Sequence, residues 1–188
     1  MKHPHLHLCC GDVYLKGYVN IDIFGKLVTE VKHNPNETDL NHYYKYTFKE
    51  SKPREFIVDK QMNILEKWDF KDKSVHEIVM ISAIEHFTKK EAEFIMSEIK
   101  RVLMPKGQLI IDFPDIKRDV ERYHDTDPEF LMELLYCNHK NKFSVHNWGY
   151  TKTTFKKLLG DGWKEVVWTN IVEHSYPMMG ALCIRENK

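Results

Sequence analysis

Apolar and polar residues alternate along the chain with two periods, one typical of strands and the other typical of helices. Short apolar runs predict strands over residues 6–10, 18–23, 55–59 and 75–83. The last of these runs is apolar almost throughout, as expected of a central parallel strand. Strands that alternate with helical segments favour an α/β domain with a mostly parallel sheet.

The clearest predicted helix follows Thr88. Thr88 and Glu91 form a capping box, in which each side chain accepts a hydrogen bond from a free backbone N–H at the helix start. Apolar residues behind them recur at helical spacing, and Pro105 and Gly107 end the pattern. A strand is predicted over residues 108–113, so the helix and its two flanking strands form a βαβ unit.

The last third of the chain predicts two more helices and a closing pair of strands. Asp127 followed by Pro128 is a typical helix start, and Thr151 can cap a second helix. Residues 164–169 and 180–185 are predicted strands, and the short link between them favours antiparallel pairing.

The length of 188 residues predicts a single domain over residues 1–188. Residues 32–54 interrupt the alternation as a polar insertion. The insertion contains Tyr43, Tyr44, Lys45, Tyr46 and Lys49. A connection of this length in a compact domain is either functional or partly disordered. Residues 116–146 are a candidate substrate lid.

Charge and composition narrow the class of function. Lysine plus arginine and aspartate plus glutamate number 28 each, so no net charge draws the chain to nucleic acid or to a membrane. The four cysteines have the spacing of neither a zinc site nor a disulfide framework. No apolar run has the length of a membrane span, and the N-terminal residues lack the apolar stretch of a signal peptide. These features predict a cytoplasmic protein.

Histidines alternate with other residues at the start of the chain. His3, His5 and His7 would share one face of an extended strand. No further ligand accompanies them in the sequence, so no metal site is predicted.

Candidate chemistry concentrates at the ends of the first two predicted strands. The first strand ends in the turn Cys9, Cys10 and Gly11, and the second ends at Asp22. In nucleotide-binding α/β folds, a glycine turn of this kind lets the backbone approach the ligand, and the acid accepts hydrogen bonds from ribose hydroxyls. Taken alone, Gly11 could simply end a strand, and Asp22 could be a turn residue.

Four ordered segments of the chain resemble the class I S-adenosylmethionine-dependent methyltransferases, and in particular a small type 11-like group of them. The segments are Leu6-His-Leu-Cys-Cys-Gly11, Ser82-Ala-Ile-Glu-His-Phe87, Arg101-Val-Leu-Met-Pro-Lys-Gly-Gln-Leu109 and His146-Asn-Trp-Gly-Tyr-Thr-Lys152. The resemblance implies a Rossmann-like fold, with an antiparallel C-terminal strand in a mostly parallel sheet flanked by helices. It also implies methyl transfer from S-adenosylmethionine, which leaves S-adenosylhomocysteine.

The same resemblance assigns roles to residues. The turn at Cys9, Cys10 and Gly11 would lie beneath the methionine part of the cofactor. Asp22, followed by Ile23, would bind the ribose diol. The remaining implied contacts are Asn63 and Ile64 near the adenine, and Ser82 and Ala83 beside the transferable methyl group.

The chain departs from the family pattern in ways that predict a shallow cofactor site and weak binding. Cys9 stands where the family has the first glycine, and a positive φ there would cost on the order of 1 kcal/mol. Six residues separate Gly11 from Tyr18, too few for a normal crossover helix. The chain also begins almost at the first strand, without the leading helix that often covers the cofactor.

A general base is needed for many oxygen or nitrogen acceptors, and three histidines are candidates. They are His86, His124 and His146, with Asp115 and Tyr123 as neighbours. Each has a plain structural alternative, and the pair Glu85 and His86 could equally be a helix-entry hydrogen-bond pair.

The sequence therefore predicts an enzyme that methylates a small molecule. The alternative is a methyltransferase-like binding module that has lost catalysis. The cysteine in the turn and the short first crossover motivate this alternative. A nicotinamide dehydrogenase is disfavoured because the Gly-x-Gly-x-x-Gly pattern is absent. A nucleic-acid methyltransferase is disfavoured by the zero net charge. The sequence predicts neither the acceptor nor the oligomeric state.

Overall fold

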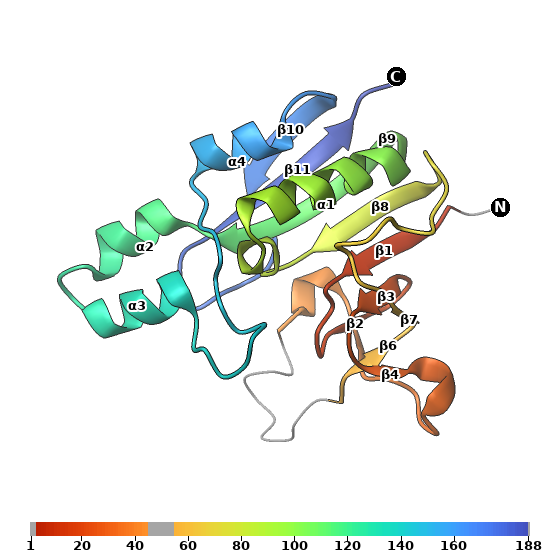
Figure 1. Ribbon diagram of the computed structural model, residues 1–188, viewed down its shortest axis with the longest axis horizontal. Coiled ribbons are helices and arrows are strands. Elements are labelled where there is room, and N and C mark those ends of the chain that lie inside the picture. Colours follow the sequence, from red (N-terminus) through yellow and green to blue (C-terminus); the bar gives the residue numbers. More distant parts are fainter. Residues whose placement is uncertain (1–2, 45–54, 188) are drawn as a thin grey trace.

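The central feature of the fold is a seven-stranded sheet with the strand order β10-β11-β9-β8-β1-β3-β7 (Figure 1). The computed structural model describes residues 3–44 and 55–187. The strands of this sheet are β1 (His5–Leu8), β3 (Val19–Asp22), β7 (Lys60–Gln61), β8 (Val75–Met80), β9 (Leu103–Pro114), β10 (Trp163–Thr169) and β11 (Met178–Arg185). Strand β11 is antiparallel to both of its neighbours, and the other pairs are parallel. The predicted mostly parallel sheet with an antiparallel C-terminal strand is thus confirmed, but the strand predicted over residues 55–59 is not part of it: residues 57–58 pair outside this sheet, and the edge strand is β7.

Helices and short strand pairs make up the other elements of the described chain. The helices are α1 (Lys89–Val102), α2 (Ile116–Tyr123), α3 (Pro128–Tyr136) and α4 (Lys152–Leu159), with the 3₁₀ turns η1 (Val28–Glu30), η2 (Leu40–His42) and η3 (Ile84–His86). The short pairs are β2 (Tyr14–Leu15) with β5 (Glu37–Thr38), and β4 (Lys26–Leu27) with β6 (Ile57–Val58).

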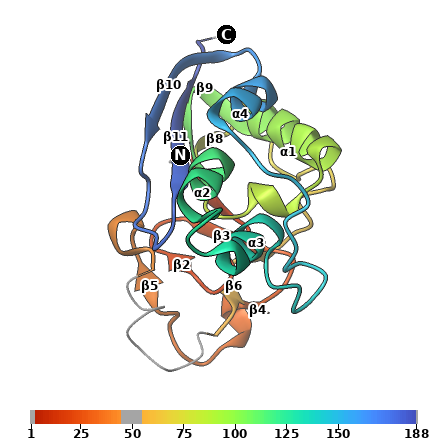
Figure 2. The same cartoon turned by 90° about the vertical axis from the view of Figure 1, so that its left-hand side faces the viewer.

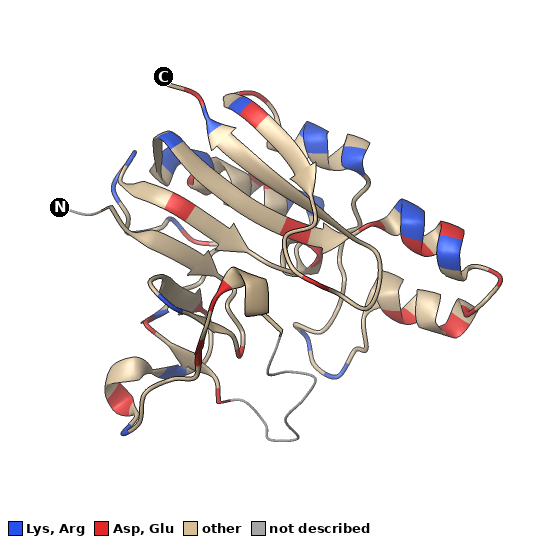
Figure 3. Ribbon diagram, turned by 180° about the vertical axis from the view of Figure 1, so that it is seen from behind, with Lys and Arg blue, Asp and Glu red and all other residues tan. Residues whose placement is uncertain are grey.

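The main core lies between the sheet and one layer of helices. Helices α1 and α4 cover the same face of the sheet (Figures 1 and 2). Ile78, Ile95, Phe113 and Phe155 are fully buried there. On the opposite face, the described residues contribute irregular segments rather than α-helices (Figure 3). A second core forms there around Val13, Leu15, Tyr43, Val79, Ile81 and Val172.

The connection between β1 and β3 contains no helix, as its shortness predicts. The two strands still pair in parallel, with Leu6 opposite Val19 and Leu8 opposite Ile21. Asn20, which is fully buried, holds the connection in place: its Oδ1 accepts a hydrogen bond from Leu15 N at 2.8 Å, and its Nδ2 donates to Leu15 O at 3.1 Å. The connection between these parallel strands therefore lacks the usual crossover helix, and the buried amide orders it by hydrogen bonds to both backbone groups of Leu15.

The predicted βαβ unit is present, but its second strand is longer than predicted. Thr88 and Glu91 cap α1 reciprocally. Strand β9 begins at Leu103, where a strand was predicted only from residue 108. Leu103 pairs with Val75, and the register shifts before the next pair, so the intervening residues form a bulge that accommodates a proline. Gly107 is required there because a Cβ atom would lie 2.9 Å from the carbonyl oxygen of His76.

Helices α2 and α3 project beyond the carboxyl end of the sheet (Figure 1). Helix α3 begins after Asp127 as predicted. Helix α2, which is capped by Asp115, was not predicted from the sequence. The chain after α3 turns back toward the tip of β3, where the ring of Phe143 meets that of Phe24 with a centroid distance of 4.9 Å. Part of the segment predicted as a lid therefore reaches the end of the second parallel strand.

Candidate active site at the carboxyl edge of the sheet

The glycine turn and the acid of the second strand lie side by side. Strand β1 ends at Leu8, and the next residues turn with positive φ at Cys9 (52°) and Gly11 (54°). The backbone N–H of Gly11 donates to Asp22 Oδ2 at 3.0 Å, and that of Phe24 donates to Asp22 Oδ1 at 3.2 Å. These contacts fix the half-buried carboxylate at the tip of β3, where its remaining lone pairs can accept further hydrogen bonds.

Cys9 and Cys10 are structural members of this turn. Cys9 adopts the left-handed conformation, at a cost of roughly 1 kcal/mol. Burial raises the pKa of both thiols well above the usual range, with the charge of Asp22 as a second cause. Protonated thiols are poor nucleophiles, so the turn contributes backbone geometry and packing rather than thiol chemistry.

Exposed apolar side chains surround Asp22. Ile23 and Phe24 follow it with 43% and 49% of their surface exposed, and Phe56 and Phe143 are similarly exposed. Large apolar side chains gathered at a surface are a typical contact for a ligand ring. An acid beside such a surface suits a nucleoside: the carboxylate matches the ribose diol, and the apolar side chains match the adenine. These residues therefore fit S-adenosylmethionine.

The residues predicted near the adenine belong to a turn after β7. The side-chain oxygen of Asn63 accepts a hydrogen bond from Leu65 N at 3.1 Å, and its nitrogen donates to Glu66 at 3.0 Å. Ile64 is buried in the main core, and its carbonyl accepts a hydrogen bond from the Trp68 indole at 3.0 Å. Asn63 is half-buried and is the more accessible of the two.

At the end of β8, Ser82 is held by a network that the sequence reading missed. Its φ is 47°, and its N–H donates to Asp112 Oδ1 at 2.8 Å. The other carboxylate oxygen of Asp112 pairs with Nε2 of His174 at 3.0 Å, and Tyr44 donates to Ser82 Oγ at 3.2 Å. Ala83, which follows, is buried. An acid within the apolar run of residues 109–113 was the signal available in the sequence.

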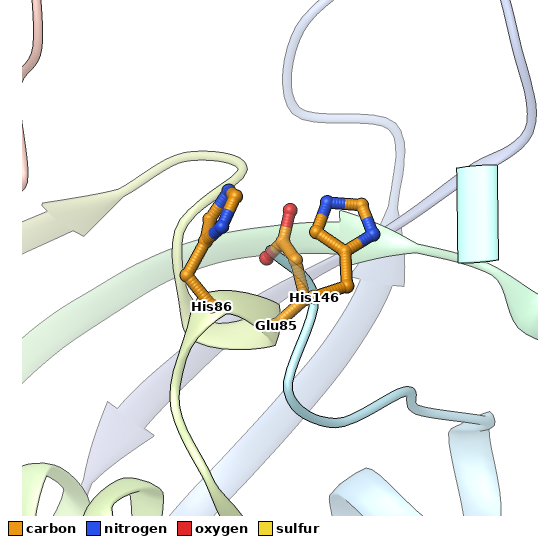
Figure 4. A group of neighbouring side chains, drawn as sticks. All are labelled: Glu85, His86 and His146. Carbon is orange, nitrogen blue, oxygen red and sulfur yellow. The ribbon is translucent and has the colours of Figure 1, made fainter. Parts of the chain in front are cut away.

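Glu85, His86 and His146 come together although the last of them is far along the chain. Figure 4 shows the Glu85 carboxylate between the two imidazole rings. Their candidate ligand atoms all lie within 4.8 Å of one another. Burial raises the pKa of Glu85 to about 8 and lowers that of His146 to about 4, and it also lowers the pKa of His86. Both rings are therefore neutral near pH 7.

The other candidate residues lie apart from this cluster. The exposed His124 pairs with the neighbouring Asp125 at 2.9 Å. Asp115 caps α2, and the ring of Tyr123 packs against Phe130. The structure thus brings two of the three candidate bases together and leaves His124 outside the pair.

The N-terminal histidines have separate partners. His3 Nδ1 contacts the Ser74 carbonyl at 3.1 Å, and the ring of His5 stacks on that of His76 with a centroid distance of 5.1 Å. His7 is fully buried in a different network. The polar insertion supplies Tyr43 and Tyr44 to the fold, whereas Lys45, Tyr46 and Lys49 lie outside the described residues.

A pocket of about 450 Å³ adjoins the Ser82 network. Its walls include Arg118 and Arg122 of α2 and the loop that leads to β11, with His174 and Tyr176. The pocket is linked to the end of β8 by hydrogen bonds: His174 in its wall pairs with Asp112, and Asp112 accepts a hydrogen bond from Ser82 N–H. Its volume falls in the usual range for small-molecule sites.

Basic residues do not gather into one surface over the described part of the chain. Lysines and arginines are distributed over several helices and strand ends and alternate with acids (Figure 3). In the same part of the chain, none of the helices has the length and apolar character needed to cross a membrane.

The sheet order, the Gly11–Asp22 pair and the nucleoside-compatible surroundings define a Rossmann-like domain of the kind that binds S-adenosylmethionine. A family model described as a methyltransferase domain matches residues 10–111, more than half of the chain. The chain belongs to this methyltransferase family, and the expected cofactor, S-adenosylmethionine, is confirmed by that membership. No curated protein sequence matches the chain significantly.

Solved structures share the fold at low identity. An S-adenosylmethionine-dependent methyltransferase from Methanosarcina mazei has a TM-score of 0.57 and 15% identity, covering 100% of this chain and 95% of that chain. A Pyrococcus horikoshii protein has a TM-score of 0.52 and 17% identity, covering 98% and 84%. Human N-acetylserotonin methyltransferase, solved with S-adenosylmethionine, has a TM-score of 0.52 and 10% identity, covering 98% and 48%.

Proposed function

We propose that the chain is an active enzyme that transfers a methyl group from S-adenosylmethionine to a small-molecule acceptor. The observation that carries the proposal is the contact between the glycine turn and the acid. Gly11 N–H donates to Asp22 at 3.0 Å, so a backbone turn and a carboxylate lie at neighbouring strand ends, an arrangement that suits close approach of a cofactor and hydrogen bonds from its ribose. The methionine part of the cofactor would lie over residues 9–11, and its ribose would lie on Asp22 with Ile23 beside it.

The acceptor would bind on the side of Ser82 and Ala83. The adjoining pocket is large enough for a metabolite, and its two arginines can donate hydrogen bonds to an anionic or hydroxyl group. The acceptor atom would attack the methyl carbon in line with the departing sulfur. The new bond forms as the carbon–sulfur bond breaks, and its electron pair leaves on neutral S-adenosylhomocysteine. The protein mainly aligns the two reactants.

His86 and His146 are the favoured bases among the three candidates. Each donates from Nδ1 to a backbone carbonyl, so Nε2 carries the lone pair that could accept a proton. They would border the strand end at which the methyl group is exposed. His124, by contrast, lies outside this pair and contacts the exposed carboxylate of Asp125.

Residues 116–146 would serve as a lid within the single domain. Two contacts support this role: the ring of Phe143 on Phe24, beside Asp22, and the hydrogen bond from His146 Nδ1 to the Leu134 carbonyl at 2.8 Å. The first joins the lid to the cofactor side, and the second ties its end back to α3.

Calorimetric titration with S-adenosylmethionine and S-adenosylhomocysteine tests the cofactor site. Replacement of Asp22 by alanine should weaken binding at least about tenfold, because the ribose loses charge-assisted hydrogen bonds of roughly 1.5–3 kcal/mol. Asp161→Ala is the matched control, since this exposed acid precedes β10 at the opposite end of the sheet. Equal affinity of wild type and Asp22→Ala would refute the proposed cofactor placement.

A binding module remains the second candidate function, favoured by the strained Cys9 and the helix-free first crossover. Mass spectrometry of S-adenosylhomocysteine release across a panel of amine, hydroxyl and carboxylate acceptors separates the two. Acceptor-dependent release supports the enzyme. Tight cofactor binding without release on any acceptor supports the binding module.

A further inference from the structure

Two segments about sixty residues apart are joined by hydrogen bonds around Glu85, His86 and His146. The N–H groups of Asn147 and Trp148 both donate to the Glu85 carbonyl, at 2.9 and 3.1 Å. The Asn147 side chain donates to the His86 carbonyl at 2.8 Å. These contacts involve backbone carbonyls, so the three side chains stay free to converge on one point, as Figure 4 shows.

The hydrogen bonds of the two imidazoles fix which nitrogen is available. His86 Nδ1 lies 3.0 Å from the Val145 carbonyl, and His146 Nδ1 lies 2.8 Å from the Leu134 carbonyl. A carbonyl only accepts, so each Nδ1 carries the proton and each Nε2 carries a lone pair. Backbone carbonyls that orient imidazoles in this way are typical of the surroundings of metal-binding histidines.

Glu85 supplies a carboxylate oxygen that lacks a partner. Glu85 is 3% exposed as a whole residue, and its Oε2 makes no hydrogen bond within the described residues. A buried polar atom left unpaired costs on the order of 1–3 kcal/mol, and a cation beside it would remove that cost. The arrangement therefore brings three potential ligand atoms together, one of them a buried oxygen without a partner.

We propose that Glu85, His86 and His146 bind a divalent transition-metal ion of the zinc class. One carboxylate oxygen and two imidazole nitrogens suit Zn²⁺ and its neighbours better than Mg²⁺ or Ca²⁺, which prefer sets of oxygen ligands. Ligand atoms about 2 Å from such an ion lie roughly 3.3 Å apart, so small side-chain rotations from the 4.8 Å limit complete the site. Three protein ligands leave at least one coordination position open.

Because η3 directly follows Ser82 and Ala83, the open position would lie near the edge of the sheet at which methyl transfer is proposed, a step that rests on the proposed function. It would take a hydroxyl, carboxylate or amine group of the acceptor. With the ion bound, both Nε2 lone pairs would be committed to it, so the base role proposed above for His86 and His146 would belong to the metal-free protein alone. In the metal-bound protein a coordinated hydroxyl would lose its proton to water more easily, and its oxygen would bond to the methyl carbon as the carbon–sulfur bond breaks and its electron pair leaves on S-adenosylhomocysteine.

The test measures metal binding directly. Untagged protein treated with a chelator is titrated with Co²⁺, followed by visible absorption, and then with Zn²⁺ in competition. Wild type should bind one equivalent of Co²⁺ that Zn²⁺ displaces. His86→Ala, His146→Ala and Glu85→Gln should each weaken binding at least about tenfold. Circular dichroism checks folding, and His146→Gln replaces the alanine variant if that one unfolds.

The control is His76→Ala, because His76 is exposed, stacks on His5 and lies at the start of β8 away from the cluster. Unchanged Co²⁺ binding in this variant supports the proposed site. Loss of binding in His76→Ala with retention in the cluster variants would assign the ion to the N-terminal histidines and overturn the proposal. Absence of Co²⁺ binding at millimolar concentration would also overturn it. S-adenosylmethionine affinity is measured in parallel, so failure of the metal site and failure of the methyltransferase site are distinguishable.

Discussion

His7 gives the fold a pH dependence that can be calculated from its surroundings. The side chain is fully buried on β1, and its Nδ1 lies 3.0 Å from Asn20 Oδ1. Tyr43 donates to its Nε2 at 2.8 Å, so the network fits the neutral ring. Burial lowers the pKa of His7 from 6.5 to about 4. Burial also raises the pKa of Tyr43 well above its usual range, so neither neighbour titrates between pH 5 and pH 7.

The sign follows from proton binding in the two states. Between pH 6.5 and pH 4 the unfolded chain binds a proton at His7 and the folded chain does not, so the contribution of His7 to stability falls as the pH falls. Integration between these two pKa values gives a loss of about 1.8 kcal/mol from pH 7 to pH 5. The loss nears its full size of about 3 kcal/mol only near pH 4.

Urea unfolding of wild type and His7→Gln at pH 7 and pH 5 isolates this contribution. Glu85 and Asp119 also have shifted pKa values, about 8 and about 7, so the pH dependence of the wild type alone mixes several groups. The difference in unfolding free energy between wild type and variant cancels those groups. We expect this difference to shrink by about 1.8 kcal/mol from pH 7 to pH 5. A difference that stays constant would refute the assignment of a neutral, buried His7.

Three further substitutions test local features by urea unfolding. Cys9→Gly should be more stable than Cys9→Ala by roughly 1 kcal/mol, because both remove the thiol and only glycine relieves the positive φ; the reverse order would contradict strain in the turn. Glu98→Ala should lower the free energy of unfolding by about 3 kcal/mol, since the buried carboxylate accepts a hydrogen bond from Trp68 N at 2.8 Å and pairs with Arg101. A loss of unfolding free energy below about 1 kcal/mol would show that the pair is dispensable. Thr88→Ala should cost about 1 kcal/mol through loss of the cap of α1, and an unchanged midpoint would contradict the capping box.

Local signals made much of the fold predictable. The reciprocal cap of Thr88 and Glu91 depends on neighbouring residues alone, and the apolar run after Val75 has the composition of a central strand. The bulge at the start of β9 was missed because Pro105 and Gly107 are turn residues in isolation. Only the pairing of Leu103 with Val75 makes them part of a strand, and that pairing depends on tertiary structure.

The site was predictable where it follows a strand end. Gly11 and Asp22 end adjacent strands, so their contact follows from the order of the sheet. The pairing of Asp112 with His174 was not predictable, because the histidine lies in an irregular loop and the contact spans 62 positions. Likewise the convergence of His146 on Glu85 and His86 depends on how the chain returns after α3, which no local pattern specifies.

A crystal structure with S-adenosylhomocysteine tests the central claim most directly, namely that the carboxyl edge of this sheet binds the cofactor for methyl transfer. We expect both ribose hydroxyls within hydrogen-bond distance of the Asp22 carboxylate, the methionine part over residues 9–11, and the sulfur facing Ser82 and Ala83. A ligand bound elsewhere, or with its ribose away from Asp22, would contradict it.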